Sequence, residues 1–138
     1  MNIWENKEYG NITFGKIEKN IVFFKYKPSI EIDINIAKDL VKNRLDYTSG
    51  QSVYTLIDFT NVKSVTKEAR DYMNSPDGGL KGILGGAFLS NSVVATLFVN
   101  LYLKVSNPSI PAKFFTNEED AVGWLRKIKT ADTHIVKN

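Results

Sequence analysis

The sequence predicts a single α/β domain in which helices pack on a mixed, largely parallel sheet that begins with an N-terminal β-hairpin. Two observations favour this fold class. Alternating apolar segments lie between Tyr9 and Tyr26, and short apolar runs alternate with amphipathic segments along the rest of the chain. Strands that alternate with helices are typical of parallel sheets, because each helix returns the chain across the sheet. The 138 residues are enough for one domain with one continuous core.

The hairpin is predicted from residue types and their spacing. Ile12, Phe14 and Ile17 follow an almost alternating pattern, and the segment 21–26 is rich in β-branched and aromatic residues. Glu18-Lys19-Asn20 separates the two strands, and asparagine adopts a positive φ at low cost. We therefore expect segment 12–17 to pair with segment 21–26.

The middle of the chain predicts an extended piece, a helix, a strand and a second helix. The extended piece ends at about Ile32, and Asp33 is then the N-cap of a helix that runs to about Asp46. The run 53–58 reads as a buried strand inside the sheet. The segment KSVTKEAR is expected to be a turn that opens the next helix, with Ser64 or Thr66 as its cap.

The C-terminal third predicts two further strand–helix units. GILGGAFL reads as a buried strand, followed by a helix from Ser92 to Val105. Segment 112–115 is the last strand, and Thr116 with Glu119 matches a capping box. We expect a flexible tail from about Thr130. The last helix then carries an apolar stripe of Ala121, Trp124, Leu125 and Ile128.

Composition restricts the function more than it identifies it. The net charge is +3, but only three of the 18 basic residues are arginine, the residue of bidentate phosphate and base recognition, so we expect no nucleic-acid partner. The absence of cysteine excludes disulfides and thiolate chemistry and fits a cytoplasmic location. The N-terminus lacks a signal-peptide pattern, and the apolar stretch 93–105 is too short for a membrane span.

Two segments carry a family resemblance. YTLIDFTNVKSVTKEAR in the middle and IPAKFFTNEEDAVGWL near the end, together with the hairpin and the alternating order, resemble the SpoIIAA-like, or STAS-like, bacterial domains. Their fold is related to anti-sigma-factor antagonists and, more loosely, to CRAL-TRIO domains. The resemblance covers about residues 9–125, is nearest to uncharacterised stand-alone members, and implies a cytoplasmic regulatory module that binds another protein.

The resemblance also implies a partner-binding surface. In anti-sigma-factor antagonists the central strand ends in an aspartate, which Asp58 matches, and an Asp-Ser-Ser-Gly-type turn follows with a phosphorylated serine. Here the Asp and the Gly of that turn are missing, so an N-cap role for Thr66 is favoured over a phosphorylated switch. We expect an interaction surface for a protein partner or a homodimer, formed by Asp58, Lys63, Ser64, Thr66, Lys67 and Arg70.

The alternative function is a carrier or sensor of a small apolar ligand such as a lipid, with a pocket lined by Leu97, Phe98 and Leu101. An enzyme is disfavoured, because the sequence contains no recognisable catalytic set, and we expect no cofactor and no metal. Asp58 is expected to cap a loop rather than act as a base. The glycine-rich segment 78–86 has its lysine before a strand instead of a helix, unlike a phosphate-binding loop.

Overall fold

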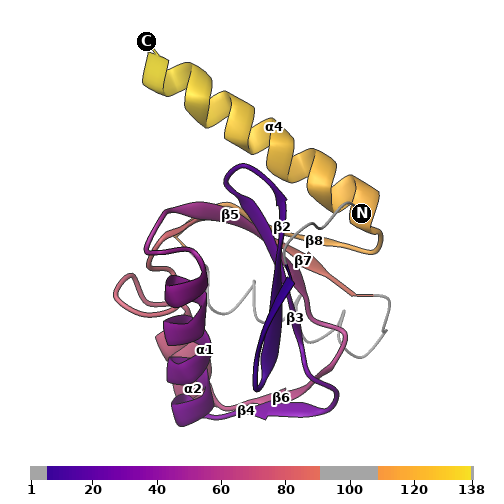
Figure 1. Cartoon of the computed structure of the whole chain (residues 1–138), viewed down its shortest axis with the longest axis vertical. Helices are drawn as coiled ribbons and strands as arrows, with labels where there is room; N and C mark the ends of the chain where they lie inside the picture. Colours follow the sequence, from indigo (N-terminus) through magenta and orange to yellow (C-terminus); the bar gives the residue numbers. More distant parts are fainter. Residues whose placement is uncertain (1–5, 91–108, 138) are drawn as a thin grey trace.

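The computed structural model describes residues 6–90 and 109–137, with side chains up to Asp132. These residues form a six-stranded sheet in the order β1-β2-β3-β5-β7-β8, a small sheet of β4 and β6, and helices on both faces of the larger sheet (Figure 1). The mixed α/β class predicted from the sequence is confirmed. The strands of the larger sheet are β1 (Asn6–Tyr9), β2 (Ile12–Glu18), β3 (Ile21–Tyr26), β5 (Val53–Asp58), β7 (Ile83–Leu89) and β8 (Ala112–Phe115).

The N-terminal half of the sheet is antiparallel. β2 and β3 form the predicted hairpin, from Ile12 opposite Tyr26 to Glu18 opposite Ile21. In its turn, Asn20 has a φ of 66°, a left-handed conformation that asparagine tolerates better than most residues. The sequence analysis missed β1, which pairs with β2 at the sheet edge. Three of its four residues are exposed, so no apolar alternation marks it.

The other half of the sheet is parallel, and β5 lies at its centre. β3 and β7 flank β5, both parallel to it, which confirms the predicted interior position. The first four residues of β5 are buried, as expected for a strand that has packed layers on both faces. β8 pairs parallel with β7 at the far edge, where the sequence analysis placed the last strand.

The small second sheet consists of two parallel strands, β4 (Ile30–Ile32) and β6 (Val62–Val65). β4 is the extended piece predicted before the first helix. β6 corrects the sequence analysis, which assigned Lys63–Val65 to a turn. Val62 and Val65 are half-buried against the core, and the two residues between them are exposed. A four-residue strand with this pattern has no period that sequence reasoning could detect.

Helices α1 (Ile34–Tyr47) and α2 (Lys67–Met73) lie on one face of the larger sheet (Figure 1). Asp33 caps α1, as predicted, because its Oδ1 accepts a hydrogen bond of 2.9 Å from the Ile36 N–H. The cap of α2 is Thr66, whose Oγ1 accepts from the Ala69 N–H at 3.1 Å, and Ser64 lies in β6. The buried core on this face consists of Ile12, Phe14, Phe24, Tyr26, Ile30, Ile32, Ala37, Leu40, Phe59 and Ala69.

Helix α4 (Glu118–Lys137) covers the opposite face of the sheet (Figure 1). The predicted capping box of Thr116 and Glu119 is wrong by one position. The cap is Asn117, whose Oδ1 accepts from the Asp120 N–H at 2.8 Å and whose Nδ2 donates to the Asp120 carboxylate at 2.8 Å. Asparagine is as strong a cap as threonine, and here it lies one residue closer to the helix.

The apolar stripe of α4 packs on the sheet as predicted. Ala121 and Leu125 are completely buried, whereas Trp124 and Ile128 are half-buried. A methyl group built on Gly85 of β7 would lie 2.7 Å from the Ile128 Cδ1, so the glycine allows α4 to approach the strand. The second buried core, on this face, consists of Ile17, Ile21, Tyr54, Leu56, Ala87, Ala121, Val122 and Leu125.

Two predictions concern segments that lie wholly or partly outside the described residues. The helix expected from Ser92 to Val105 lies outside the described residues. The backbone of the predicted tail from Thr130 is helical up to Lys137, as the continuation of α4. The flexibility expected of that tail stays a prediction.

Candidate functional site

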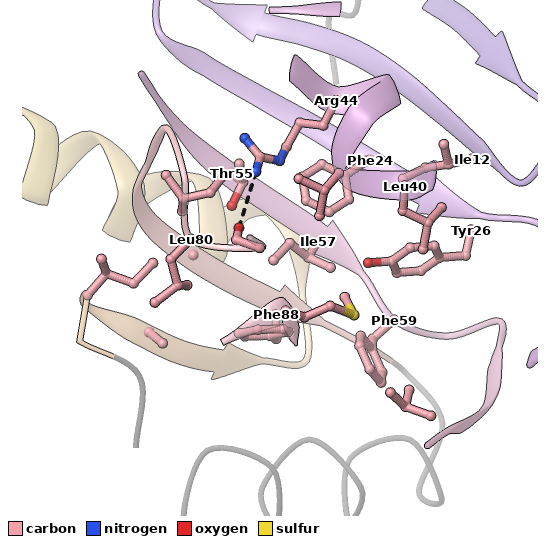
Figure 2. A pocket seen from close by; sticks show the side chains of 18 of the residues that line it. Ile12, Phe24, Tyr26, Leu40, Arg44, Thr55, Ile57, Phe59, Leu80 and Phe88 are labelled. Atoms are coloured by element: carbon pink, nitrogen blue, oxygen red, sulfur yellow. Dashed lines mark hydrogen bonds between the residues drawn. The ribbon is translucent and has the colours of Figure 1, made fainter. Parts of the chain in front are cut away.

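A cavity lies between the sheet and the two helices α1 and α2. Its volume is about 90 Å³, and its described walls include residues of β2, β3, β5, β6, β7, β8, both helices and the loop before β7 (Figure 2). Most of the lining is apolar, with Leu40 of α1, Ile57 of β5 and Phe88 of β7 among the labelled side chains of Figure 2. An apolar cavity with a few polar groups is the usual form of a small-molecule site.

Arg44 supplies a positive charge to one end of this cavity. The residue is only 4% exposed, and it lies on the buried stripe of α1 with Ala37, Leu40 and Val41. Its Nη2 donates a hydrogen bond of 3.2 Å to the Gly79 carbonyl oxygen, drawn in Figure 2, and its buried Nη1 has no hydrogen-bond partner. Burial lowers the pKa of the Arg44 guanidinium to about 10. The group therefore still carries its charge at neutral pH.

The other polar groups in the described lining do not neutralise this charge. Arg70 of α2 is half-buried and also lines the cavity. Thr55 of β5 is completely buried and donates its hydroxyl proton to the Gly85 carbonyl at 3.2 Å. No aspartate or glutamate is among the described residues that line the cavity. The described lining is thus largely apolar and carries a net positive charge.

The predicted interaction surface lies next to this pocket, along the β5–β6 turn, β6 and the start of α2. Asp58 behaves as the predicted loop cap, since its Oδ1 accepts from the Thr60 N–H at 3.0 Å. Lys63 and Ser64 are exposed on β6, and Thr66 is exposed where it caps α2. Whether these residues bind a partner stays a prediction.

The two remaining cations of the surface differ in their surroundings. Lys67 is exposed and forms an ion pair with Asp71 at 2.9 Å, so its charge is partly compensated. Arg70 is three residues further on, as predicted, but it contributes to the cavity wall rather than only to the exposed face. The predicted surface and the cavity therefore share Arg70.

Sequence reasoning missed Arg44, although a signal for it existed. Arg44 follows Leu40 and Val41 at the four- and three-residue spacing of one helix face, so a charged residue continues an apolar stripe. Leu97, Phe98 and Leu101, the pocket residues predicted from the sequence, lie outside the described residues. A pocket lined by them stays a prediction.

Other candidate sites found no support in the described parts of the chain. Within residues 6–90 and 109–132, no three His, Cys, Asp or Glu side chains gather into a possible metal site. Lys81 of the glycine-rich segment lies in the turn before β7 and not at the start of a helix. No described helix is both long and apolar enough to cross a membrane.

Comparison with known proteins identifies the fold and the family. Among solved structures, the chain is similar to an uncharacterised protein of the DUF3478 family from Shewanella loihica PV-4, described as having a SpoIIAA-like fold. The two share 16% sequence identity with a TM-score of 0.59, over 91% of this chain and 98% of the other. The SpoIIAA-like fold expected from the resemblance is thus confirmed.

Sequence comparisons identify the family but no curated relative. No curated protein sequence matches the chain. A family model described as a domain of unknown function, DUF7793, matches residues 15–129, which is most of the chain. The chain therefore belongs to the DUF7793 family.

Proposed function

We propose that this chain is a non-enzymatic, cytoplasmic protein-interaction module of the STAS-like type. Its partner-binding surface would be the predicted one along β6 and the start of α2, with a separate protein or a second copy of the chain as partner. The SpoIIAA-like fold supports a module of this kind. The observation that carries the proposal is that this surface combines a fixed backbone with exposed polar side chains.

Hydrogen bonds fix the backbone on both sides of the surface. The Asn61 side chain donates to the Tyr26 carbonyl at 2.9 Å, and the Asn61 carbonyl accepts from the Ile30 N–H at 3.1 Å. At the other end, the Thr66 N–H donates to the Ile32 carbonyl at 3.0 Å. A preordered segment loses little conformational entropy when a partner binds, which favours affinity.

The exposed side chains favour a partner with acidic groups. Lys63 is exposed on β6, and no described carboxylate forms an ion pair with it. Lys67 adds a second exposed ammonium group, although Asp71 compensates part of its charge. Complementary charges mainly accelerate association, so binding should slow as salt is added.

The test compares two charge-reversed variants of the full chain. Lys63→Glu with Lys67→Glu changes the proposed surface, and Lys113→Glu with Lys127→Glu makes the same change in charge on β8 and α4. Proteins captured from a lysate by the unmodified chain are quantified by mass spectrometry, and sedimentation measures self-association. We expect a partner, or the dimer, to be lost with the first variant and retained with the second. Equal retention by both variants would contradict the proposed surface.

A further inference from the structure

The cavity beside α1 contains a charge that no described acidic side chain balances. Gly79 provides the one described hydrogen-bond acceptor of Arg44, and it is a neutral carbonyl. None of the ion pairs among the described residues includes Arg44 or Arg70. A buried guanidinium with an unpartnered Nη1 is costly, because burial removes the hydration that water gives to a free cation. Because Arg44 lines the cavity, an anion bound there would offset this positive charge.

The charge and shape of the site select a monoanion with an apolar body. A carboxylate matches a guanidinium in both charge and planar geometry. A dianionic phosphate would lose far more hydration in a pocket whose other walls are largely apolar. Arg70 also lines the cavity, and no described lining residue is acidic, so the lining favours an anion over a cation.

The volume limits the size of the ligand. A cavity of roughly 150 Å³ admits benzene, so about 90 Å³ leaves room for a body of only a few carbon atoms. We propose that this cavity binds a short-chain monocarboxylic acid, with its carboxylate at the Arg44 guanidinium and its alkyl chain among the apolar side chains around Ile57 and Phe88. This inference does not depend on the proposed interaction surface.

The first experiment needs no variant. Butanoate and its neutral isostere butanamide are titrated into the unmodified chain at constant ionic strength, and amide NMR shifts and thermal unfolding are recorded. We expect saturable binding of butanoate, with a Kd on the order of 1 mM or below for so small a ligand, and at least about tenfold weaker binding of butanamide. Equal binding of the two, or no binding of either, would overturn the proposal.

Two substitutions then test the charge and the space separately. Arg44→Met removes the guanidinium but keeps an unbranched side chain, and butanoate affinity should fall by at least about tenfold. Gly86→Ala adds a methyl group at the cavity wall, 3.6 Å from both Ile57 Cδ1 and Thr55 Oγ1, so it reduces the volume without a clash. This variant should also lose butanoate binding while it remains folded.

A matched glycine provides the control. Gly123→Ala adds the same methyl group on α4, where no atom lies within 4 Å of it, and should leave butanoate binding unchanged. Binding by the charge-reversed Lys63→Glu, Lys67→Glu variant should also persist, which separates the cavity from the interaction surface. Retained butanoate affinity in Arg44→Met, with a folded NMR spectrum, would refute the role assigned to the guanidinium.

Discussion

Replacing Arg44 with methionine should stabilise the unliganded protein. Burial removes hydration and lowers the pKa of its guanidinium to about 10. At about 1.4 kcal/mol per pH unit, this lowering corresponds to a cost of about 3 kcal/mol for the charged form. Methionine removes that cost and retains much of the apolar packing of the arginine side chain. The substitution also leaves the Gly79 carbonyl without its donor, which costs about 1.5 kcal/mol.

The balance predicts a free energy of unfolding about 1–2 kcal/mol higher than that of the unmodified protein. Urea unfolding at pH 7, followed by circular dichroism, measures the difference. An unchanged m-value would show that the variant and the unmodified protein expose the same amount of surface on unfolding. Arg126→Met is the matched control. Arg126 lies on α4 with its side chain 58% exposed and paired with Glu18 at 2.7 Å, so its loss should cost no more than about 1 kcal/mol.

The pH dependence gives a second readout of the same charge. The folded-state pKa of Arg44 is lowered, so the unfolded chain holds this proton more tightly and the charge destabilises the fold at all pH values well below 10. The difference in free energy of unfolding between the two proteins should therefore stay constant from pH 7 to 9 and shrink as the pH rises above about 10. If Arg44→Met instead lowers the free energy of unfolding by more than about 1 kcal/mol at pH 7, the buried guanidinium stabilises the fold and the prediction is wrong.

Three further predictions concern other parts of the fold. Asn117→Ala should lower the free energy of unfolding by about 1 kcal/mol in urea melts, because Asn117 caps α4. Thr116→Ala should change it by less than about 0.5 kcal/mol, and a larger loss in Thr116→Ala than in Asn117→Ala would show that Thr116 is the cap after all. Gly85→Ala should cost about 1–3 kcal/mol in the same assay, since its methyl group would lie 2.7 Å from Ile128, and a neutral result would mean that α4 can shift without loss. Burial raises the pKa of Glu18, but the hydrogen bond and charge of Arg126 and the charge of Lys129 together outweigh it and lower that pKa. Acid titration should therefore cost the unmodified protein more stability below pH 4.5 than it costs Glu18→Gln; parallel acid-unfolding curves would contradict this.

Elements that carry their own periodicity could be predicted from the sequence. The hairpin strands, α1 and the stripe of α4 each combine apolar spacing with turn or cap residues, so local and tertiary preferences agree. β1 and β6 have no such pattern and exist because partner strands supply their hydrogen bonds. The cap of α4 illustrates the limit at single residues, where Thr116 and Asn117 are both good caps and only the end of β8 decides between them.

The candidate site was much harder to predict than the fold. Its walls come from elements spread over most of the chain, and only the packed structure shows that they enclose a volume. A single sequence does show that Arg44 continues the apolar stripe of α1, but not that its Nη1 lacks a partner. Asp58 could be assigned as a loop cap, because the aspartate side chain commonly bonds to a backbone N–H two residues on.

The position of β5 also has a consequence for how the protein opens. Leu56 belongs to the core under α4, and the next residue, Ile57, packs against the core under α1 and α2. If the α1 and α2 layer detaches in a local fluctuation, β5 remains hydrogen-bonded to β3 and β7 and covered by α4. Amide deuterium would then enter α1 and α2 through partial opening, but it would enter β5 only when the whole molecule unfolds. A ligand in the cavity should therefore slow exchange in α1 and α2, because it suppresses the partial opening.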